Sequence, residues 1–260
     1  KVSTDTPFVI PRISGIENVV ACSRKNPYGH IMKRNAGIHF TSDKSILKYS
    51  DLYLAAFNDC ELYASWEPWG HYIKHIGDTQ EYIKNQFKKN TFSAYGFDIF
   101  HSIYAPWTHA MKGKRILIIS PFIDTFQKQS RTGIYGVDLF PDCELVYIKP
   151  PQTQGTEPSK DWFNEYESFC KRLNDIKDTF DIALCSCGGY ANPVCHYLYT
   201  IGKSAIYVGG VLQMYFGVYG NRWLKERPDV MKLYLNMEWK RPSKEETPSG
   251  ATTIENKCYW

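Results

Sequence analysis

The last third of the chain carries one short pattern twice, and this repeat limits the possible folds more than any other feature. In residues 181–190, and again in residues 204–213, an apolar run ends at a pair of glycines and a segment with helical character follows. In an open parallel sheet, ligands bind outside the carboxyl ends of the strands, where strand gives way to helix. Glycines at that point remove side chains, so backbone N–H groups and a helix N-terminus can face an anion.

The repeat therefore predicts a nucleotide or sugar-phosphate pocket at one edge of a sheet. The alternative is that the glycines only permit tight turns between strand and helix. The candidate residues at the two edges are Gly188, Gly189, Tyr190, Gly209, Gly210 and Gln213.

Strands and helices alternate from residue 114 to about residue 215. Residues 114–120 and 144–148 are apolar runs typical of buried strands, and residues 159–177 have the charge order that a helix prefers. This alternation predicts an α/β fold, a Rossmann-like, doubly wound, mostly parallel sheet with helices on both faces. A chain of 260 residues can form it as a single domain.

The domain is expected to have three parts. Residues 1–113 hold the candidate carboxylates, residues 114–226 form the Rossmann-like nucleotide-binding part, and residues 227–260 are a tail that wraps over the sheet. Within the first part we expect a strand over residues 8–12, a helix from about Ile16, and a buried strand over Leu52–Phe57. Helices are expected over residues 81–89 and 97–111.

Composition excludes several classes of protein. A net charge of +4, with lysines and arginines scattered along the chain, fits one anionic ligand better than a nucleic-acid backbone. Eight cysteines without a CxxC pair argue against zinc and a disulfide framework, and favour reduced thiols in the cytoplasm. No apolar stretch is long enough to span a membrane, and no signal peptide is evident. A first residue other than Met fits one domain of a longer, multidomain chain.

Three groups of carboxylates are candidates for catalysis, and the third is Glu67, which Trp66 and Trp69 flank in a composition that suits sugars. Glu17 is expected in the first turn of the helix that follows the first strand, with Arg12 close by for a phosphate. Asp59 and Glu61 form an Asp-x-Glu just past the expected strand Leu52–Phe57, a common way to present oxygens to Mg²⁺ or Mn²⁺. A solvated helix start is the alternative for the second group.

Polar residues that follow the other expected strands complete the candidate pocket. Side-chain amides can bind a base or sugar hydroxyls, and an arginine can add charge and a stacking face. These residues are Ser120, Pro121, Phe122, Gln154 and Arg222. A GxGxxG fingerprint, a Walker phosphate loop and a GxSxG elbow are absent, which disfavours a dehydrogenase, a kinase and an α/β-hydrolase.

Several of these segments together resemble the GT-D-type glycosyltransferases, and modules in the glycan-building enzymes of large algal DNA viruses. The segments are residues 12–17, 35–37, 114–122, 188–190, 209–217 and 222–223, together with the closing residues 258–260. The resemblance implies a Rossmann-like enzyme that uses a nucleotide-diphosphate sugar. It also implies donor-binding roles for Arg12, Ser14, Gly15 and Asn35, and a virus-encoded enzyme in the host cytoplasm as one setting.

One departure from that family concerns its metal motif, Arg-Phe-Gly-Asp-Gly-Glu, in which an Asp-x-Glu holds the metal. This chain keeps Arg12 and Glu17 but has Gly15 where the aspartate stands. Either Asp59 and Glu61 hold Mn²⁺ or Mg²⁺ instead, or Arg12 and helix N-termini balance the diphosphate without metal. Glu17 is then free to act as the catalytic base, with Asp59 as the alternate.

We therefore expect a hexosyl- or deoxyhexosyltransferase that moves a sugar, most simply from a UDP-sugar, to a hydroxyl of an oligosaccharide or glycoprotein glycan. The chemistry needs stabilisation of the leaving group and a carboxylate to accept a proton. A non-catalytic carbohydrate- or nucleotide-binding module of a larger protein is the main rival. A Rossmann-like methyltransferase is a third reading, weakened because Ser120-Pro121-Phe122 replaces a glycine-rich loop after the first long strand.

Overall fold

A five-stranded parallel sheet forms the centre of the molecule in a computed structural model, which describes residues 6–67, 73–129, 131 and 134–260. The strand order is β1-β7-β6-β4-β5, and every neighbouring pair is parallel. The strands are β1 (Val9–Ile10), β4 (Arg115–Ile119), β5 (Glu144–Ile148), β6 (Ile182–Cys185) and β7 (Ser204–Tyr207).

A small second sheet continues the first one beyond β1. It pairs β2 (Leu62–Ser65) with β3 (Asn90–Ser93) in parallel. Just past the end of β1, the Ile13 N–H donates to the Ala64 carbonyl and the Ala64 N–H donates to the Pro11 carbonyl, both at 2.9 Å. The carboxyl ends of seven parallel strands therefore form one continuous edge.

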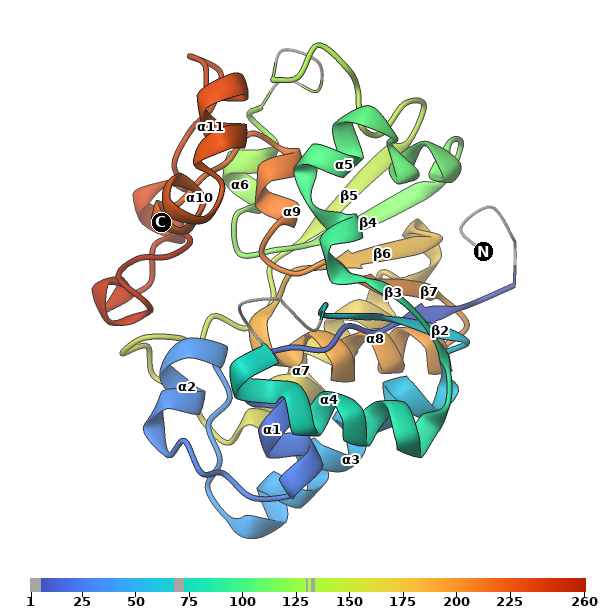
Figure 1. The fold of residues 1–260 in the computed structure, drawn as a ribbon, viewed down its shortest axis with the longest axis vertical. Helices are drawn as coiled ribbons and strands as arrows, with labels where there is room; N and C mark the ends of the chain where they lie inside the picture. Colours follow the sequence, from blue (N-terminus) through green and yellow to red (C-terminus); the bar gives the residue numbers. More distant parts are fainter. Residues whose placement is uncertain (1–5, 68–72, 130, 132–133) are drawn as a thin grey trace.

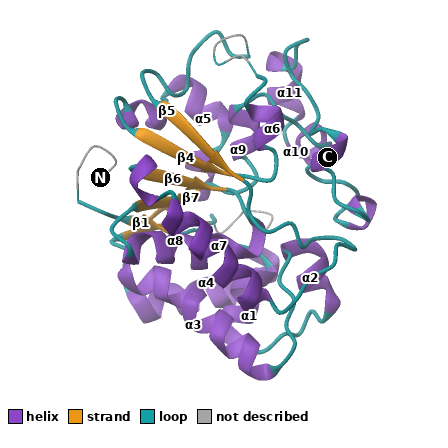
Figure 2. Cartoon of the chain, turned by 180° about the vertical axis from the view of Figure 1, so that it is seen from behind, coloured by secondary structure: helices purple, strands orange, loops and turns teal. Residues whose placement is uncertain are grey.

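Helices cover both faces of the sheet (Figures 1 and 2). Helices α1, α3, α4, α7 and α8 lie on one side, and α5, α6 and α9 lie on the other. The helices are α1 (Ile16–Ser23), α2 (His30–Ala36), α3 (Asp43–Asp59), α4 (Ile73–Phe87), α5 (Ile99–Tyr104), α6 (Ile123–Phe126), α7 (Trp162–Asp175), α8 (Ala191–Thr200), α9 (Leu212–Tyr215), α10 (Asn221–Glu226) and α11 (Pro228–Tyr234).

The two faces of the sheet bury two separate cores because side chains alternate along each strand. In β4, Leu117 and Ile119 join the core beneath α1, α3, α7 and α8, whereas Ile116 and Ile118 join the core beneath α5, α6 and α9. All four side chains have no exposed surface. An apolar run with no polar alternation is what a strand covered on both faces requires.

The expected fold class is confirmed. The chain forms an α/β domain with a parallel sheet between helices, and the expected strands at residues 114–120 and 144–148 become β4 and β5. The two glycine-paired units supply β6 and β7, and the helix expected over residues 159–177 is α7.

The strand expected over Leu52–Phe57 is wrong, because these residues lie inside the 17-residue helix α3. Tyr49, Tyr53, Ala56 and Phe57 are buried at helical spacing, so the apolar run is the inner face of a long helix. The helix begins where the Ser42 side chain accepts a hydrogen bond from the Ser45 N–H at 3.2 Å. The helix expected over residues 97–111 is also wrong as one element, since α5 ends at Tyr104 and a short 3₁₀ segment begins at Trp107.

The strand order creates a switch point between β4 and β6. After β4 the chain moves outward to β5, whereas after β6 it moves in the opposite direction to β7. Connections that diverge in this way leave a crevice at the carboxyl ends of the two strands. The fold thus directs a ligand to the loops that begin at Ser120 and Ser186.

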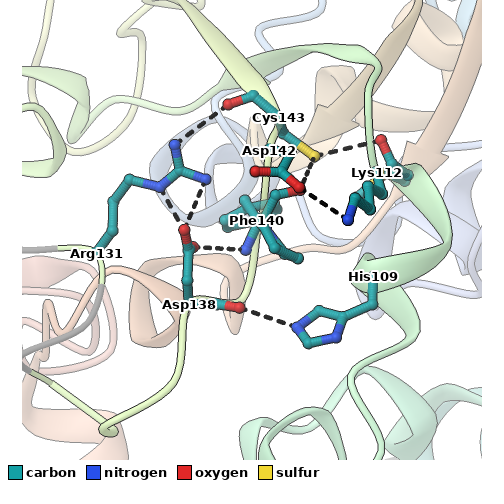
Figure 3. A network of polar contacts seen from close by, with 9 residues as sticks. His109, Lys112, Arg131, Asp138, Phe140, Asp142 and Cys143 are labelled. Atoms are coloured by element: carbon teal, nitrogen blue, oxygen red, sulfur yellow. Dashed lines mark hydrogen bonds and ion pairs between the residues drawn. The ribbon is translucent and has the colours of Figure 1, made fainter.

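A polar network holds the long connection between α6 and β5 against the segment before β4 (Figure 3). The Asp138 carboxylate accepts from Arg131 Nε at 3.2 Å, and its backbone carbonyl lies 2.9 Å from His109 Nε2. Lys112 pairs with Asp142 at 2.9 Å. Each charge in this network has a partner and none of these residues reaches the cleft described below, so we assign the network a scaffolding role.

Candidate functional site

A cleft of about 750 Å³ opens along the carboxyl ends of the strands. Its lining residues follow successive strands: Gln154 follows β5, Pro121 β4, Gly188 β6, Gly209 β7 and Tyr95 β3. At about 4.8 Å between neighbouring strands, the edge from β5 to β3 is roughly 29 Å long. The cleft thus crosses the switch point and extends over both sheets.

Arg12 lies near the middle of this edge, just past β1. Its Nη1 donates to the Val208 carbonyl at 3.0 Å, and its guanidinium lies over the rings of Tyr207 at 4.5 Å and Trp66 at 5.6 Å. Gly209, with φ +82°, leaves the room for this arrangement, because a Cβ there would lie 2.2 Å from Arg12 Nη2. The guanidinium is therefore fixed in place at the cleft wall.

Within the described part of the chain, no direct ion pair neutralises the charge of Arg12. Among the described residues, no carboxylate lies within 4.0 Å of it, and its buried Nε–H has no hydrogen-bond partner there. A buried donor without a partner costs about 1–3 kcal/mol. Arg12 is thus the cation in the cleft best placed for an anionic ligand.

Glu17 faces the same region from the first turn of α1. Burial raises the pKa of its carboxyl above the ordinary value, and the nearby charge of Glu255 raises it further. The N–H groups of Glu17 and Gly15 and the charge of Arg12 act in the opposite direction without cancelling the effect of burial. A carboxylate with a raised pKa is a better proton acceptor than a solvated one, which suits a general base.

The paired glycines admit other parts of the chain at close range. A Cβ on Gly188 would lie 2.9 Å from the Ala36 carbonyl, and one on Gly189 would lie 2.4 Å from the Ile38 side chain. A Cβ on Gly210 would lie 2.3 Å from the Tyr259 ring. Close packing therefore accounts for the glycines as fully as ligand approach does, although Gly188 and Gly210 also line the cleft.

The C-terminal segment forms one wall of the cleft. Arg222 forms ion pairs with Glu255 and, at 3.4 Å, with Glu226. Its guanidinium also lies 4.6 Å from the centre of the Tyr259 ring, and Asn35 Nδ2 lies 3.5 Å from the Glu255 carboxylate. Arg222 thus reaches the cleft with its charge balanced by carboxylates of its own wall.

The N-terminus of α6, which follows β4 at the switch point, already holds a carboxylate of the chain. Glu246, 5% exposed, accepts from the N–H groups of Asp124 at 2.8 Å and Thr125 at 3.1 Å, from the Thr125 hydroxyl, and from the Ser243 N–H at 3.2 Å. An anionic ligand therefore gains no free donors from these groups.

The structure brings most of the predicted donor-binding residues to the cleft. The lining includes Arg12, Ser14, Gly15, Glu17, Asn35, Pro121, Phe122, Gln154, Gly188, Tyr190, Gly209, Gly210 and Arg222. Ser120, Gly189 and Gln213 lie behind this surface: Ser120 Oγ accepts from the Phe122 N–H at 3.2 Å, and Gln213 Nε2 donates to the Tyr259 carbonyl at 3.3 Å.

Asp59 and Glu61 are not brought to the cleft. Because residues 52–57 are helical, Asp59 ends α3 and Glu61 precedes β2, at the amino edge of the strands. The Asp59 carboxylate lies 2.8 Å from His196 Nε2. Burial raises the pKa of Asp59, but the hydrogen bonds from His196 and Asn58 outweigh it and leave the pKa below its ordinary value. These contacts fit a surface ion pair between α3 and α8.

Sequence reasoning missed several residues that complete the cleft. They come from segments distant in the chain, and the high aromatic content, 15%, is the signal that could have drawn attention to them. The missed lining residues include Tyr28, Tyr95, Asp98, Tyr207, Glu226, Arg227, Glu255 and Tyr259. Trp66, which the sequence offers beside Glu67, also lines the cleft, and Trp69 lies outside the described residues.

The carboxylates of the described residues bear on whether the chain itself can surround a divalent metal. Among them, no group of three or more His, Cys, Asp or Glu side chains comes together. A Cβ on Gly15 would lie 3.7 Å from Glu17 Oε2, so the missing aspartate would stand beside Glu17. Glycine in that position leaves Glu17 without the second carboxylate of an Asp-x-Glu.

In the part of the chain that the structure describes, no helix has the length and apolar character needed to cross a bilayer.

The fold has relatives among solved structures. A glycosyltransferase (DUF1792) from Streptococcus sanguinis aligns with a TM-score of 0.52 at 14% identity, over 84% of this chain and 79% of that chain. This chain has the fold of a glycosyltransferase. A second structure, of a domain of unknown function (DUF1792), aligns with a TM-score of 0.50 at 16% identity, over 84% of this chain and 76% of that chain. No protein-family model matches the chain, and no curated protein matches its sequence.

Proposed function

We propose that this protein is a GT-D-type glycosyltransferase that moves a sugar from a nucleotide-diphosphate donor to a carbohydrate hydroxyl. The observation that carries the proposal is that two residues with complementary chemistry line the same cleft. Arg12 is a cation without an ion-pair partner among the described residues, and Glu17 is a carboxylate of raised pKa. Both line one cleft at the switch point of a fold shared with a glycosyltransferase.

Arg12 is assigned to the diphosphate. In the reaction the bond between the sugar C1 and the diphosphate breaks, and negative charge grows on the leaving oxygen. A guanidinium held in place by Tyr207 and Gly209 stabilises that charge without reorganising during the step. Its planar donors match phosphate oxygens.

Glu17 is assigned to the acceptor. As the hydroxyl oxygen forms its bond to the sugar, its proton passes to the Glu17 carboxylate, which becomes a neutral carboxylic acid. Burial favours that neutral form, as the raised pKa indicates. The same burial therefore stabilises Glu17 after it has accepted the proton.

We further propose that the positive charge of Arg12 takes the place of a metal, and that UDP is the nucleotide of the donor. The test of the metal assignment is Gly15→Asp, which restores a second carboxylate beside Glu17. We expect wild-type protein to bind no Mn²⁺ in the cleft and Gly15→Asp to bind it, measured by electron paramagnetic resonance. Strong Mn²⁺ binding by the wild type that Glu17→Gln removes would contradict the assignment.

The deciding experiment compares Glu17→Gln with the matched control Glu61→Gln, which lies outside the cleft. We first screen UDP, GDP, CDP and dTDP for thermal shifts, with and without Mn²⁺. The corresponding nucleotide-sugars are then assayed for release of nucleoside diphosphate. We expect Glu17→Gln to bind the nucleotide but lose turnover, while Glu61→Gln keeps both.

The rival function is a non-catalytic binding module, and the specific observation in its favour is Gly15 in place of a carboxylate beside Glu17. A nucleotide shift without turnover of any nucleotide-sugar in the wild type would favour that rival. No shift with any nucleotide would reject the nucleotide-sugar proposal itself.

A further inference from the structure

One end of the cleft differs in chemistry from the rest. We call it the aromatic end and define it as Trp66, Tyr95, Asp98 and Arg227, all of which line the cleft. Trp66 follows β2, Tyr95 follows β3, and Arg227 follows α10. The opposite end, at the loop after β5, is lined by side-chain amides and prolines, including Gln152 and Gln154.

The aromatic end is built from interlocking contacts. Trp66 Nε1 donates to the Ile13 carbonyl at 3.0 Å, and the rings of Trp66 and Tyr95 meet edge to face with centroids 5.4 Å apart. Arg227 pairs with the Asp98 carboxylate, and its guanidinium lies 5.8 Å from the centre of the Tyr95 ring. Asp98 also accepts from the Phe100 N–H at 3.1 Å. Two half-buried rings are thus held beside an ion pair.

The position of the aromatic end relative to the reacting groups is fixed by Arg12. The Arg12 guanidinium lies over the Trp66 ring, and the charge of Arg12 also acts on the Glu17 carboxyl, whose pKa it lowers against the larger effect of burial. Arg12 is therefore shared between the aromatic end and the expected base. The amide end follows β5, which lies on the other side of the switch point from β1 in the strand order.

We propose that the aromatic end binds a pyranose ring of the acceptor saccharide, with Tyr95 as its platform. Aromatic rings beside fixed charged hydrogen-bonding groups suit a ligand with apolar C–H faces and a rim of hydroxyls. Tyr95 supplies the part of its ring that lines the cleft, beside the Arg227 guanidinium, and the Asp98–Arg227 pair supplies an acceptor and donors for hydroxyls. That this saccharide is the acceptor rests on the proposed function, whereas the existence of a saccharide site at the aromatic end does not.

The test uses methyl glycosides of glucose, galactose, xylose, rhamnose and fucose as probes, in saturation-transfer-difference NMR with UDP present. Tyr95→Ala removes the platform, and the matched control Tyr95→Phe keeps the ring. Tyr95→Leu keeps apolar volume without an aromatic face and serves if Tyr95→Ala unfolds. We expect at least one glycoside to bind wild type and Tyr95→Phe, with at least a tenfold weaker dissociation constant for Tyr95→Ala and Tyr95→Leu.

Equal binding of the glycosides by Tyr95→Leu and wild type would overturn the proposal, as would no binding of any of them by the wild type. The thermal shift with nucleoside diphosphates reports the donor site separately. A Tyr95-dependent glycoside signal without any nucleotide shift would keep the saccharide site and reject the transferase. A thermal shift with a nucleotide, together with glycoside binding that does not depend on Tyr95, would keep the transferase proposal and reject the saccharide site at Tyr95.

Discussion

Replacing Gly209 with alanine tests whether the position of Arg12 controls donor binding. A Cβ at residue 209 would lie 2.2 Å from Arg12 Nη2. Non-bonded heavy atoms prefer about 3.5 Å, so the guanidinium must move by roughly 1.3 Å. That movement breaks its 3.0 Å hydrogen bond to the Val208 carbonyl and displaces its charge from the cleft wall.

Gly209→Ala also introduces backbone strain, which a matched control can subtract. Gly209 has φ +82° and Gly202 has φ +79°, but a Cβ on Gly202 would meet nothing within 4 Å. Each alanine should cost about 1–2 kcal/mol from the left-handed conformation. In a domain of this size that lowers the melting temperature by about 2–8 °C, measured by differential scanning fluorimetry. Gly209→Ala adds the displacement of Arg12 to this shared cost.

The difference should appear in affinity for the nucleoside diphosphate that gives the largest thermal shift. One charge-assisted hydrogen bond contributes about 1.5–3 kcal/mol. Its loss weakens binding about 10- to 150-fold. Isothermal titration calorimetry should show this loss for Gly209→Ala and none for Gly202→Ala. If both variants bind the nucleotide as tightly as the wild type, Arg12 does not hold the diphosphate from the position described here.

Three further predictions concern single carboxylates. Glu246→Ala leaves the N–H donors at the start of α6 unsatisfied, so it should lower the free energy of unfolding by about 2 kcal/mol and the melting temperature by about 4–8 °C. The control Glu245→Ala, at an exposed side chain, should change the melting temperature little. Asp59→Asn should keep transfer activity. Its melting temperature should fall below that of the wild type at pH 7 and converge with it in acid. The reason is that hydrogen bonds, chiefly from His196, lower the pKa of Asp59 against the effect of burial, and this lowered pKa stabilises the fold only while the carboxylate is charged. Glu17→Gln should raise the melting temperature at pH 7, because burial raises the folded-state pKa of Glu17 and stability is lost as the pH rises from about 4.5 through that pKa. An unchanged melting temperature for Glu17→Gln at pH 7 would count against that shift.

The Rossmann-like half of the fold could be predicted from sequence because three of its strands, β4, β6 and β7, are almost wholly buried and the edge strand β5 is partly buried. Such strands are short apolar runs bounded by glycine, proline or polar residues, which the sequence shows directly. The N-terminal half could not be predicted in the same way. Residues 52–57 are apolar because they include the inner face of α3, and a short apolar run does not distinguish a strand from part of a buried helix.

The sequence could also predict only part of the candidate site. Arg12 and Glu17 could be identified together because six consecutive residues, which run from just past β1 into the first turn of α1, carry both. The contacts that give them their properties come from far along the chain: Tyr207 beneath the guanidinium and Glu255 beside the carboxylate. The Asp-x-Glu of Asp59 and Glu61 predicts a site only if a strand ends just before it. Because residues 52–57 are helical, the local motif places both residues wrongly.

The junction between the two sheets falls on the backbone of Arg12, and this has a thermodynamic consequence. Pro11 and Ile13 hydrogen-bond to Ala64 of the small sheet, while the Arg12 N–H and carbonyl bind the side-chain amide of Asn192 in α8. A ligand that draws the small sheet toward the large one moves the residue expected to hold the diphosphate. If a ligand at one end shifts Arg12 in this way, binding at the two ends of the cleft is coupled, and each ligand changes the affinity of the other by the same factor.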